Sequence, residues 1–369
     1  SDRPGHLRVA IRSAGGAEAS SSLVLTLLTD RGDTVSVTEK PLAGTAPADT
    51  VTFPLRLAPG FYQAVISVAG AFPGHVSGAS DAAGEVRRFN IGCDPEKIVS
   101  PRDRQEDFDE FWAQSLEELS QVKPEYRLTL LPEHSNGVRR TWRVDMRSFG
   151  GEWISGIYME PVAPGRYPVF INYMGYGATL WYNDPSARPE AAEFTLCVRN
   201  QGLNRRPGEA DDWVTRGIGS RDTYYYRGAF MDVVRAVDFV ASREKVDTAM
   251  IFAEGGSQGG AFTLVAASLD RRIKGIAPFV PFLSDFPDYF AIAPWPSQPV
   301  LQAADRLGVS REELFRTLSY FDVKNFTDRI TCPVLMGFGL QDDVCPPHTN
   351  FAGYNMITSS KTYVTFPPR

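Results

Sequence analysis

A serine surrounded by glycines is the residue of this chain best suited to act as a nucleophile. Residues 252–261 read FAEGGSQGGA, with Ser257 at the centre of a G-x-S-x-G pattern. The apolar run before it favours a strand, and the run after it favours a helix. In such a turn the serine takes a strained backbone conformation, and Gly255 and Gly259 are needed because side chains there would collide with the strand and the helix. The turn presents the hydroxyl above a sheet, which indicates attack on a carbonyl carbon.

Two backbone segments are candidates for binding the oxyanion that such an attack creates. Gln258 follows the serine at the start of the expected helix, where a free N–H group and the helix dipole favour negative charge. In folds that carry such a serine turn, a second N–H donor comes from the loop after another strand. The strand FINYMG at residues 170–175 leads into such a loop at Gly175-Tyr176-Gly177. An ordinary β-turn is the alternative interpretation of this second segment.

Two aspartates follow a later apolar strand, in the segment VLMGFGLQDDVCPP at residues 334–347. In the chain order Ser-Asp-His, the acid of the triad comes after the nucleophile. Asp342 is nearer the end of the strand, so we expect it, rather than Asp343, to orient the catalytic histidine. A helix-capping aspartate ahead of Pro346 and Pro347 is the alternative, and each aspartate can fill one of the two roles.

The general base of the triad is not expected among these residues. In folds with this triad order, the histidine follows the last strand of the sheet. The segment KTYVTF at residues 361–366 predicts that last strand, and all four histidines of the chain come earlier. His6 and His75 belong to the N-terminal region, and His134 lies in a turn between early strands. His348 is the only serious substitute, but the prolines before it start a helix, so its ring is expected to cap or flank that helix.

The elements that must position these residues change character along the chain. Residues 7–90 hold six short β segments separated by turn residues, which predicts a small β-sandwich of immunoglobulin type over residues 1–95. A linker is expected at 96–104. Over 105–369, a helix and three antiparallel-type strands precede alternating strands and helices. This order predicts the α/β class, with an α/β-hydrolase fold and a doubly wound, mostly parallel sheet that lacks the C-terminal end of the fold.

The hydropathy pattern places the helices and the buried strands of the second domain. Apolar residues at helical spacing predict helices at 106–122, 224–241 and 258–268. Several later strands are continuous apolar runs, as expected for parallel strands that are covered on both faces.

Composition and charge exclude several classes of partner and cofactor. A net charge of −6 and a pI near 5.4 argue against nucleic acid or anionic membranes as partners. No apolar run approaches the ~20 residues of a membrane span. The cysteines lack paired spacing and are expected to be buried free thiols rather than disulfides: Cys93, Cys197, Cys332 and Cys345. Because the histidines are scattered and serine acyl transfer requires none, no metal or organic cofactor is expected.

The longer strings around these motifs resemble one family. From about residue 100 onward the chain resembles the acetyl xylan esterase and cephalosporin C deacetylase group, carbohydrate esterase family 7. The strings are EDFDEFW, GYG, TRGI…TYYYRGAFMDVVRAVDFV, GGSQGG and GLQDDVCPPHTNFAGYN. The resemblance implies deacetylation of small acetylated carbohydrates by Ser257, with Asp342 as the acid and the N–H groups of Tyr176 and Gln258 as oxyanion donors. It also implies a histidine just past Arg369.

The chain departs from the family pattern at two points. The family's R-G-Q motif reads Arg199-Asn200-Gln201 here, and Arg199 and Gln201 are expected to support the site rather than to react. The N-terminal β-domain is an addition to the compact members, so their ring-shaped hexamers need not extend to this chain, and a homo-oligomer is left open. A β-sandwich fused to a carbohydrate esterase favours export to the periplasm or the cell exterior.

An acetylated oligosaccharide or polysaccharide is the expected substrate, and two other functions stay open. Trp181, Trp213 and Trp295 are candidates for a sugar-stacking face near Tyr176, with core packing as the alternative. A broader short-chain carboxylesterase is the enzymatic alternative. The non-enzymatic alternative is a carbohydrate-binding relative that retained the strand-serine-helix turn around Ser257, called the nucleophile elbow, without catalysis. A propeller-bearing peptidase is disfavoured, because ~95 residues cannot form several four-stranded blades.

Overall fold

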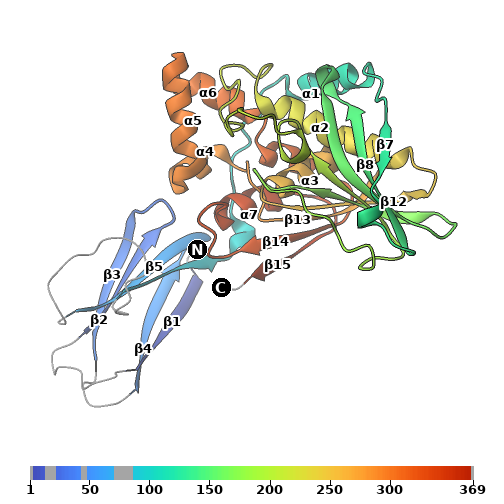
Figure 1. Cartoon of the computed structure of the whole chain (residues 1–369). Coiled ribbons are helices and arrows are strands. Elements are labelled where there is room, and N and C mark those ends of the chain that lie inside the picture. Colours follow the sequence, from blue (N-terminus) through green and yellow to red (C-terminus); the bar gives the residue numbers. More distant parts are fainter. Residues whose placement is uncertain (1–2, 13–21, 43–47, 70–85, 367–369) are drawn as a thin grey trace. The chain divides into compact units, whose positions relative to one another are not determined.

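The computed structural model describes residues 3–12, 22–42, 48–69 and 86–366 of the chain. It divides into two compact units, one of residues 1–99 with 367–369 and one of residues 100–366 (Figure 1). The division falls inside the expected linker, because side chains from residue 100 onward bond within the larger unit. Ser100, for example, donates to Asp285 at 2.8 Å. His75 lies outside the described residues.

The N-terminal unit consists of antiparallel strands in two sheets. One sheet pairs β1 with β4, and the other has the order β3-β2-β5-β6. Each of the six segments singled out by the sequence forms a strand: β1 (Arg3–Arg12), β2 (Ser22–Thr29), β3 (Thr34–Pro41), β4 (Ala48–Leu57), β5 (Gly60–Ala69) and β6 (Val86–Cys93).

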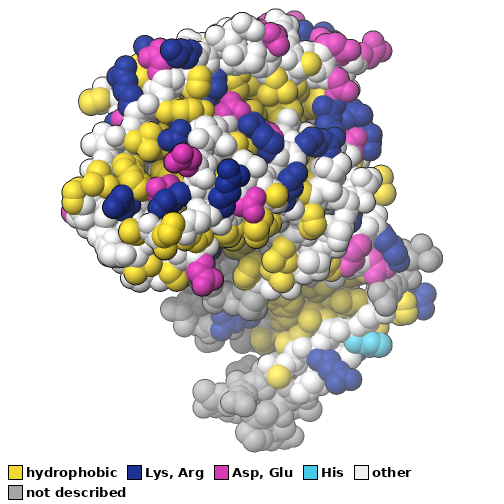
Figure 2. All heavy atoms as spheres, turned by 90° about the vertical axis from the view of Figure 1, so that its right-hand side faces the viewer, with side chains coloured by type: hydrophobic (Ala, Val, Ile, Leu, Met, Phe, Trp, Pro, Cys, Tyr) yellow, Lys and Arg dark blue, Asp and Glu magenta, His cyan; other side chains and the backbone are white. Residues whose placement is uncertain are grey.

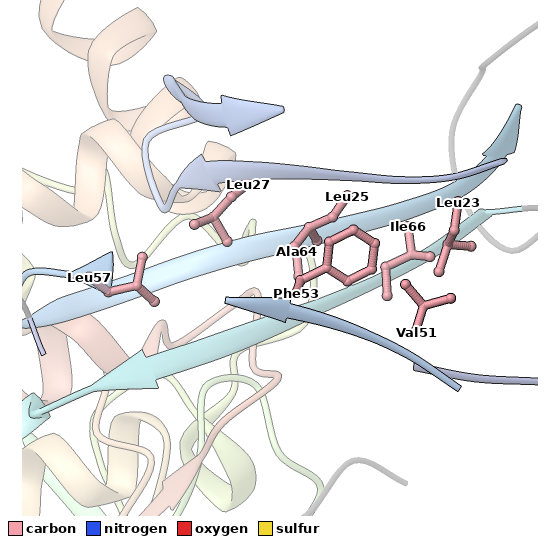
Figure 3. Close-up of a cluster of buried hydrophobic side chains, with 8 residues drawn as sticks. All are labelled: Leu23, Leu25, Leu27, Val51, Phe53, Leu57, Ala64 and Ile66. Atoms are coloured by element: carbon pink, nitrogen blue, oxygen red, sulfur yellow. The ribbon is translucent and has the colours of Figure 1, made fainter. Parts of the chain in front are cut away.

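Alternate side chains of these strands form the core of the unit. Figure 3 shows buried residues from β2, β4 and β5 directed toward one another: Leu23, Leu25, Leu27, Val51, Phe53, Leu57, Ala64 and Ile66. In β2 the inward positions are every second residue, which is the period of a strand with one buried face. The immunoglobulin type of this region stays a prediction.

The larger unit is built on a nine-stranded sheet with the order β15-β14-β13-β12-β10-β11-β9-β8-β7. The strands from β10 to β15 run parallel to one another, and β9, β8 and β7 extend the sheet beyond β11 in antiparallel fashion. Their bounds are β7 (Arg127–Leu130), β8 (Arg139–Arg147), β9 (Trp153–Pro161), β10 (Tyr167–Tyr173), β11 (Ala192–Cys197), β12 (Val246–Gly256), β13 (Ile273–Phe279), β14 (Val334–Gly339) and β15 (Lys361–Phe366). β10 is the central strand in this order, and β12, whose carboxyl end carries the candidate nucleophile, lies directly beside it.

Helices connect the parallel strands and cover the site. The three helices expected from the sequence are α1 (Phe108–Ser120), α2 (Tyr225–Ala241) and α3 (Gln258–Leu269). Three more were not anticipated and lie between β13 and β14: α4 (Phe286–Ile292), α5 (Pro294–Leu307) and α6 (Arg311–Ser319). Their proline-rich start, APWPSQP, weakens the helical pattern, although Ser310 and Glu313 form a capping box at α6. The last helix, α7 (Pro347–Met356), follows the aspartate pair.

One sequence expectation differs from the structure. Cover on both faces was expected for the parallel strands, but within the described residues the face that carries Phe252 and Leu335 borders an open groove of about 350 Å³. Leu335 and Val364 are nearly half-exposed there. An apolar run therefore indicates a parallel strand correctly without showing what covers each of its faces.

The surface carries both signs of charge, and the cysteines form no disulfide. Figure 2 shows Lys and Arg side chains interspersed with Asp and Glu side chains on one face of the molecule. None of the four cysteines is in a disulfide, and Cys197, Cys332 and Cys345 are buried, which confirms the expectation of buried free thiols for these three. Among the described residues, no helix combines the length and the apolar character needed to cross a membrane.

Candidate active site

The candidate nucleophile lies at a sharp turn from strand to helix. Ser257 directly follows β12 and precedes α3, with φ 55° and ψ −120°. This conformation is unfavourable for a residue with a side chain, so the surrounding structure must hold it in place. It does so through the backbone, because the Ser257 N–H donates to the carbonyl of Phe279 at 2.9 Å and the Ser257 carbonyl accepts from the N–H of Phe282 at 3.0 Å.

The glycines of the motif are required by close backbone approach. A Cβ atom at Gly255 would lie 2.6 Å from the carbonyl oxygen of Tyr173, and one at Gly259 would lie only 2.0 Å from the same atom. Tyr173 ends β10, the neighbouring strand, so α3 begins in contact with that strand's backbone. The physical reason expected for these glycines, collision with the strand, therefore operates at both positions.

The second predicted oxyanion segment lies beside the elbow. A Cβ atom at Gly175 would be 3.7 Å from the carbonyl oxygen of Gly256, so the two turns adjoin. Gly177 has φ +64°, and its N–H donates to Gln201 Oε1 at 3.0 Å, which fixes the turn on one side of Tyr176. Within the described residues, the N–H groups of Tyr176 and Gln258 have no acceptor, as an oxyanion site requires.

A buried amide pair locks these two turns together. Gln201 and Gln258 exchange hydrogen bonds through their side-chain amides, at 3.2 and 3.1 Å. Gln201 also donates to Tyr225, and Tyr226 donates to Gln258, each at 3.0 Å. Gln258 is fully buried. Gln201 therefore contacts both segments that were predicted to bind the oxyanion, and its supporting role stays a prediction.

An ion pair holds the segment that precedes Gln201. The guanidinium of Arg199 donates to both carboxylate oxygens of Asp232, at 2.9 and 2.7 Å, and the Arg199 backbone N–H donates to the same group. Asp232 is completely buried in α2. Asn200, which stands where the family has glycine, has φ 60° and donates to Glu209 at 2.7 Å. Asparagine tolerates this left-handed conformation better than most side chains, so the turn accommodates the departure.

The loop after β14 carries the aspartate pair and reaches Ser257 through Cys345. Asp342 Oδ1 accepts hydrogen bonds from the N–H groups of Val344 and Cys345 at 2.9 and 2.8 Å, while Asp343 is exposed. The Cys345 sulfur lies 3.8 Å from the hydroxyl oxygen of Ser257. Burial, reinforced by the charge of Asp342, raises the pKa of the Cys345 thiol to about 12. The thiol is therefore neutral and is not a base for the serine, and sequence reasoning had not placed it at the site.

The described histidines have other surroundings. His6 lies in β1 of the N-terminal unit. The ring of His134 stacks on Tyr182 with centroids 3.6 Å apart. His348 lies at the start of α7, and its Nε2 is 3.3 Å from a carboxylate oxygen of Asp288 in α4.

Aromatic side chains gather around Tyr176. Its ring centroid is 4.9 Å from that of Trp213 and 5.3 Å from that of Trp295. Trp213 is buried, whereas Trp295 is 38% exposed and stacks on Phe282, the residue that bonds to the Ser257 carbonyl. Of the three tryptophans considered from sequence, two thus lie beside Tyr176. Trp181, which is also exposed, instead donates to Asn183.

This fold, with a strained serine between a central strand and a helix and with free N–H groups beside it, defines a serine hydrolase of the α/β-hydrolase class. Residues 96–368 match the model of the acetyl xylan esterase (AXE1) family, and the chain belongs to that family. It is accordingly a carboxylic ester hydrolase.

Relatives of known name and solved structures agree with this assignment. The acetyl esterase Axe7A of Xylanibacter ruminicola is 28% identical over 328 residues, which cover 84% of this chain and 70% of that protein. The acetyl xylan esterase of Paenibacillus sp. R4 superposes with a TM-score of 0.69 at 33% identity, over 74% of this chain and 92% of that one. Acetyl xylan esterase 1 of Thermoanaerobacterium sp. JW/SL YS485 gives a TM-score of 0.68 at 28% identity, over 74% and 91%.

Proposed function

We propose that this protein removes acetyl groups from acetylated xylan and xylo-oligosaccharides, with Ser257 as the nucleophile. The observation that carries the proposal is the conformation of Ser257, φ 55° and ψ −120°, at a strand-to-helix turn within the region that matches the family. Such strain persists only where the surroundings impose it, and it is typical of a nucleophile elbow.

In the proposed mechanism the acyl group is transferred in two steps. The Ser257 oxygen attacks the acetyl carbonyl while its proton passes to a base, and the negative charge on the carbonyl oxygen is held by the N–H groups of Tyr176 and Gln258. The C–O bond to the sugar then breaks, and the sugar oxygen takes the proton. Water cleaves the acetyl-enzyme by the same route and releases acetate. Each oxyanion donor is worth about 3 kcal/mol in the transition state.

We propose that Asp342 orients the base of the triad. Its carboxylate is held by two backbone N–H groups of its own loop, and that loop brings Cys345 against Ser257. Asp343 is exposed and lies one residue farther from β14. Both facts favour Asp342 as the acid.

The base itself is proposed to be a histidine that these 369 residues do not include. The triad order places it after β15, and His348 is engaged with Asp288 instead. His348→Ala in the active protein is then expected to keep deacetylation within about tenfold. If the 369-residue chain is fully active and this substitution abolishes its activity, His348 is the base and the proposal is wrong.

The aromatic group around Tyr176 supports a sugar as the leaving group. Trp295 is partly exposed and stacks on Phe282, and the ring of Tyr176 packs against the ring of Trp295. A sugar ring has apolar C–H faces that stack on such a surface. We therefore propose that Trp295 contacts the carbohydrate while the acetyl group lies over Ser257.

The experiment that tests this function is acetate release from acetylated xylan, acetylated xylo-oligosaccharides and cephalosporin C, with Ser257→Ala as the control. Release from the xylan substrates, and none by the variant, is the expected result. A preference for longer acyl chains in p-nitrophenyl esters would favour a broader carboxylesterase. Failure of Ser257 to react with a fluorophosphonate probe would favour a carbohydrate-binding role without catalysis.

We also infer export to the periplasm or the cell exterior, where polymeric xylan is found, and leave assembly as a homo-oligomer to measurement. Cell fractionation tests the first inference, and sedimentation of the purified protein tests the second. Recovery of all activity from the cytoplasmic fraction would contradict export.

A further inference from the structure

At the starts of α4 and α7 the fold brings together three side chains that can bind a metal, two from one segment and a third 60 residues further along the chain. Asp285 and Asp288 lie at the start of α4, and His348 lies at the start of α7. One ligand atom from each residue lies within 4.8 Å of the other two. The histidine and Asp288 approach to 3.3 Å, close to the separation of about 3.4 Å between two ligands of one tetrahedral zinc ion.

Asp285 offers an unused carboxylate oxygen to this cluster. Its side chain is 1% exposed, and Oδ1 accepts hydrogen bonds from Ser100 at 2.8 Å and from Lys324 at 2.9 Å. Oδ2 is buried and has no hydrogen-bond partner among the residues that the structure describes. A buried carboxylate oxygen without a partner is costly, because nothing replaces the water that it lost. Its position among two other ligands indicates that a cation fills this role.

The charges around Asp285 leave an excess of negative charge. Lys324 is the buried cation of this region, and it lies 2.9 Å from Asp285, 3.5 Å from Asp103 and 4.0 Å from Asp322. Three carboxylates therefore share this lysine, and Asp288 adds a fourth carboxylate beside Asp285. Burial raises the pKa of Asp285, and Asp288 adds to the shift while Lys324 opposes it. A divalent cation beside Asp288 would remove the excess.

The backbone presents Asp285 to the cluster in a fixed position. Asp285 has φ 58° and ψ 58°, and its N–H and that of Phe286 donate to the two carboxylate oxygens of Asp322, each at 2.8 Å. Asp322 is fully buried, so this arrangement is rigid. Rigid presentation from a supporting layer is what holds a metal ligand in place.

We propose that Asp285, Asp288 and His348 form a binding site for a divalent transition-metal ion, with Zn²⁺ as the preferred ion. An imidazole with two carboxylates suits zinc and its neighbours better than Mg²⁺ or Ca²⁺, which take oxygen ligands alone. Three protein ligands leave a fourth position for water. No spacing pattern marks this site in the sequence, because two ligands come from the start of α4 and the third from α7, 60 residues further along.

The site would join the two sides of the catalytic machinery. Asp285 comes three residues after Phe282, which bonds to the Ser257 carbonyl, and His348 comes three residues after Cys345, which lies against the serine hydroxyl. A bound ion therefore ties the start of α4 to the start of α7 and stabilises the loop that carries Asp342. Its role is structural, since the ligands point to one another rather than to the reacting atoms.

Metal content and thermal stability of the whole protein test this inference independently of catalysis. The protein is stripped with EDTA, dialysed against Zn²⁺, Mn²⁺ or Mg²⁺, and examined by elemental analysis and thermal unfolding. About one equivalent of Zn²⁺ is expected, with a rise in Tm of roughly 5–10 °C at about 100 times Kd, and little response to Mg²⁺. His348→Ala and Asp288→Asn, both at partly exposed positions, are expected to lose the bound ion and the rise in Tm.

Matched controls separate this site from adventitious binding. His134→Ala removes a histidine of the same unit that stacks on Tyr182, and Asp305→Asn removes an exposed acid of α5; both variants are expected to bind like the wild type. Equal zinc content in the wild type and in His348→Ala overturns the proposal. So does a Tm that depends on pH through His348 but not on any of the three ions, since that result assigns the cluster to an ion pair alone.

Discussion

The two halves of the active site are held in different ways. Around Ser257, backbone segments are in close contact: there is no room for a Cβ atom at Gly259 against the Tyr173 carbonyl. The N–H and the carbonyl of Ser257 are both hydrogen-bonded to other backbone groups. On the acid side, Asp342 is held mainly by N–H groups of its own partly exposed loop. The proposed nucleophile, Ser257, is therefore positioned by close packing and backbone strain, and the proposed acid, Asp342, by local hydrogen bonds. Substitutions are expected to act through shape on the first side and through chemistry on the second.

The largest effect is expected from the nucleophile itself. Ser257→Ala removes only the attacking oxygen, so kcat is expected to fall by roughly 10⁴-fold or more while the unfolding temperature is kept. Acetate release and thermal unfolding of the same preparation measure both quantities. Residual activity within tenfold of the wild type would exclude Ser257 as the nucleophile.

A comparison of the two aspartates tests the acid side. Asp342→Asn preserves shape but favours the wrong tautomer of the histidine, so kcat is expected to fall by up to about 10⁴-fold. Asp343→Asn is the matched control and is expected to stay within about tenfold. If Asp343→Asn lowers kcat more than Asp342→Asn in steady-state kinetics, the acid is Asp343 rather than Asp342.

Support beneath the oxyanion turns is tested by Arg199→Ala. The substitution leaves the carboxylate of Asp232 buried without its cation, which costs about 3–5 kcal/mol, and activity is expected to decline together with Tm. Arg205→Ala breaks an exposed pair with Asp211 and is expected to cost at most about 1 kcal/mol. Abolished activity at an unchanged Tm would instead give Arg199 a direct part in catalysis or substrate binding.

Two glycine substitutions contrast the halves directly. Gly259→Ala drives a methyl group against the Tyr173 carbonyl at 2.0 Å, and a loss of roughly 1–3 kcal/mol or more is expected from denaturant unfolding. Gly339→Ala, before the acid loop, meets the side chain of Asp342 at 3.2 Å and is expected to cost less. Equal losses would show that both halves are equally rigid.

The smallest effect is expected at the aromatic surface. Trp295→Ala is expected to raise KM for acetylated xylo-oligosaccharides by about 3- to 10-fold, because one stacking contact is worth about 0.5–1.5 kcal/mol. Hydrolysis of p-nitrophenyl acetate, which has no sugar, is expected to change little. The ring of Trp181 donates to Asn183. A similar rise in KM for Trp181→Ala would show that the sugar also contacts Trp181, away from Tyr176.

Much of the catalytic unit could be predicted from the sequence because its signals are local. The G-x-S-x-G turn, the strand before it and the helix after it are all encoded within about 25 residues, and the structure has β12, Ser257 and α3 in those places. The family resemblance is confirmed by the family match and the solved relatives. The helices α4 to α6 were missed, since prolines and a short amphipathic pattern obscure their periodicity.

The type and order of the elements, and the serine at the elbow, can be predicted from the sequence, because periodicity and turn chemistry depend on neighbours along the chain. Which distant side chains meet depends instead on how these elements pack. The amide pair of Gln201 with Gln258 depends on how adjacent strands are ordered in the sheet, and so does the approach of Cys345 to Ser257. The cluster of Asp285, Asp288 and His348 likewise arises from the packing of α4 against α7. Local patterns leave such long-range pairings open, since the same strands and helices can be packed in more than one arrangement.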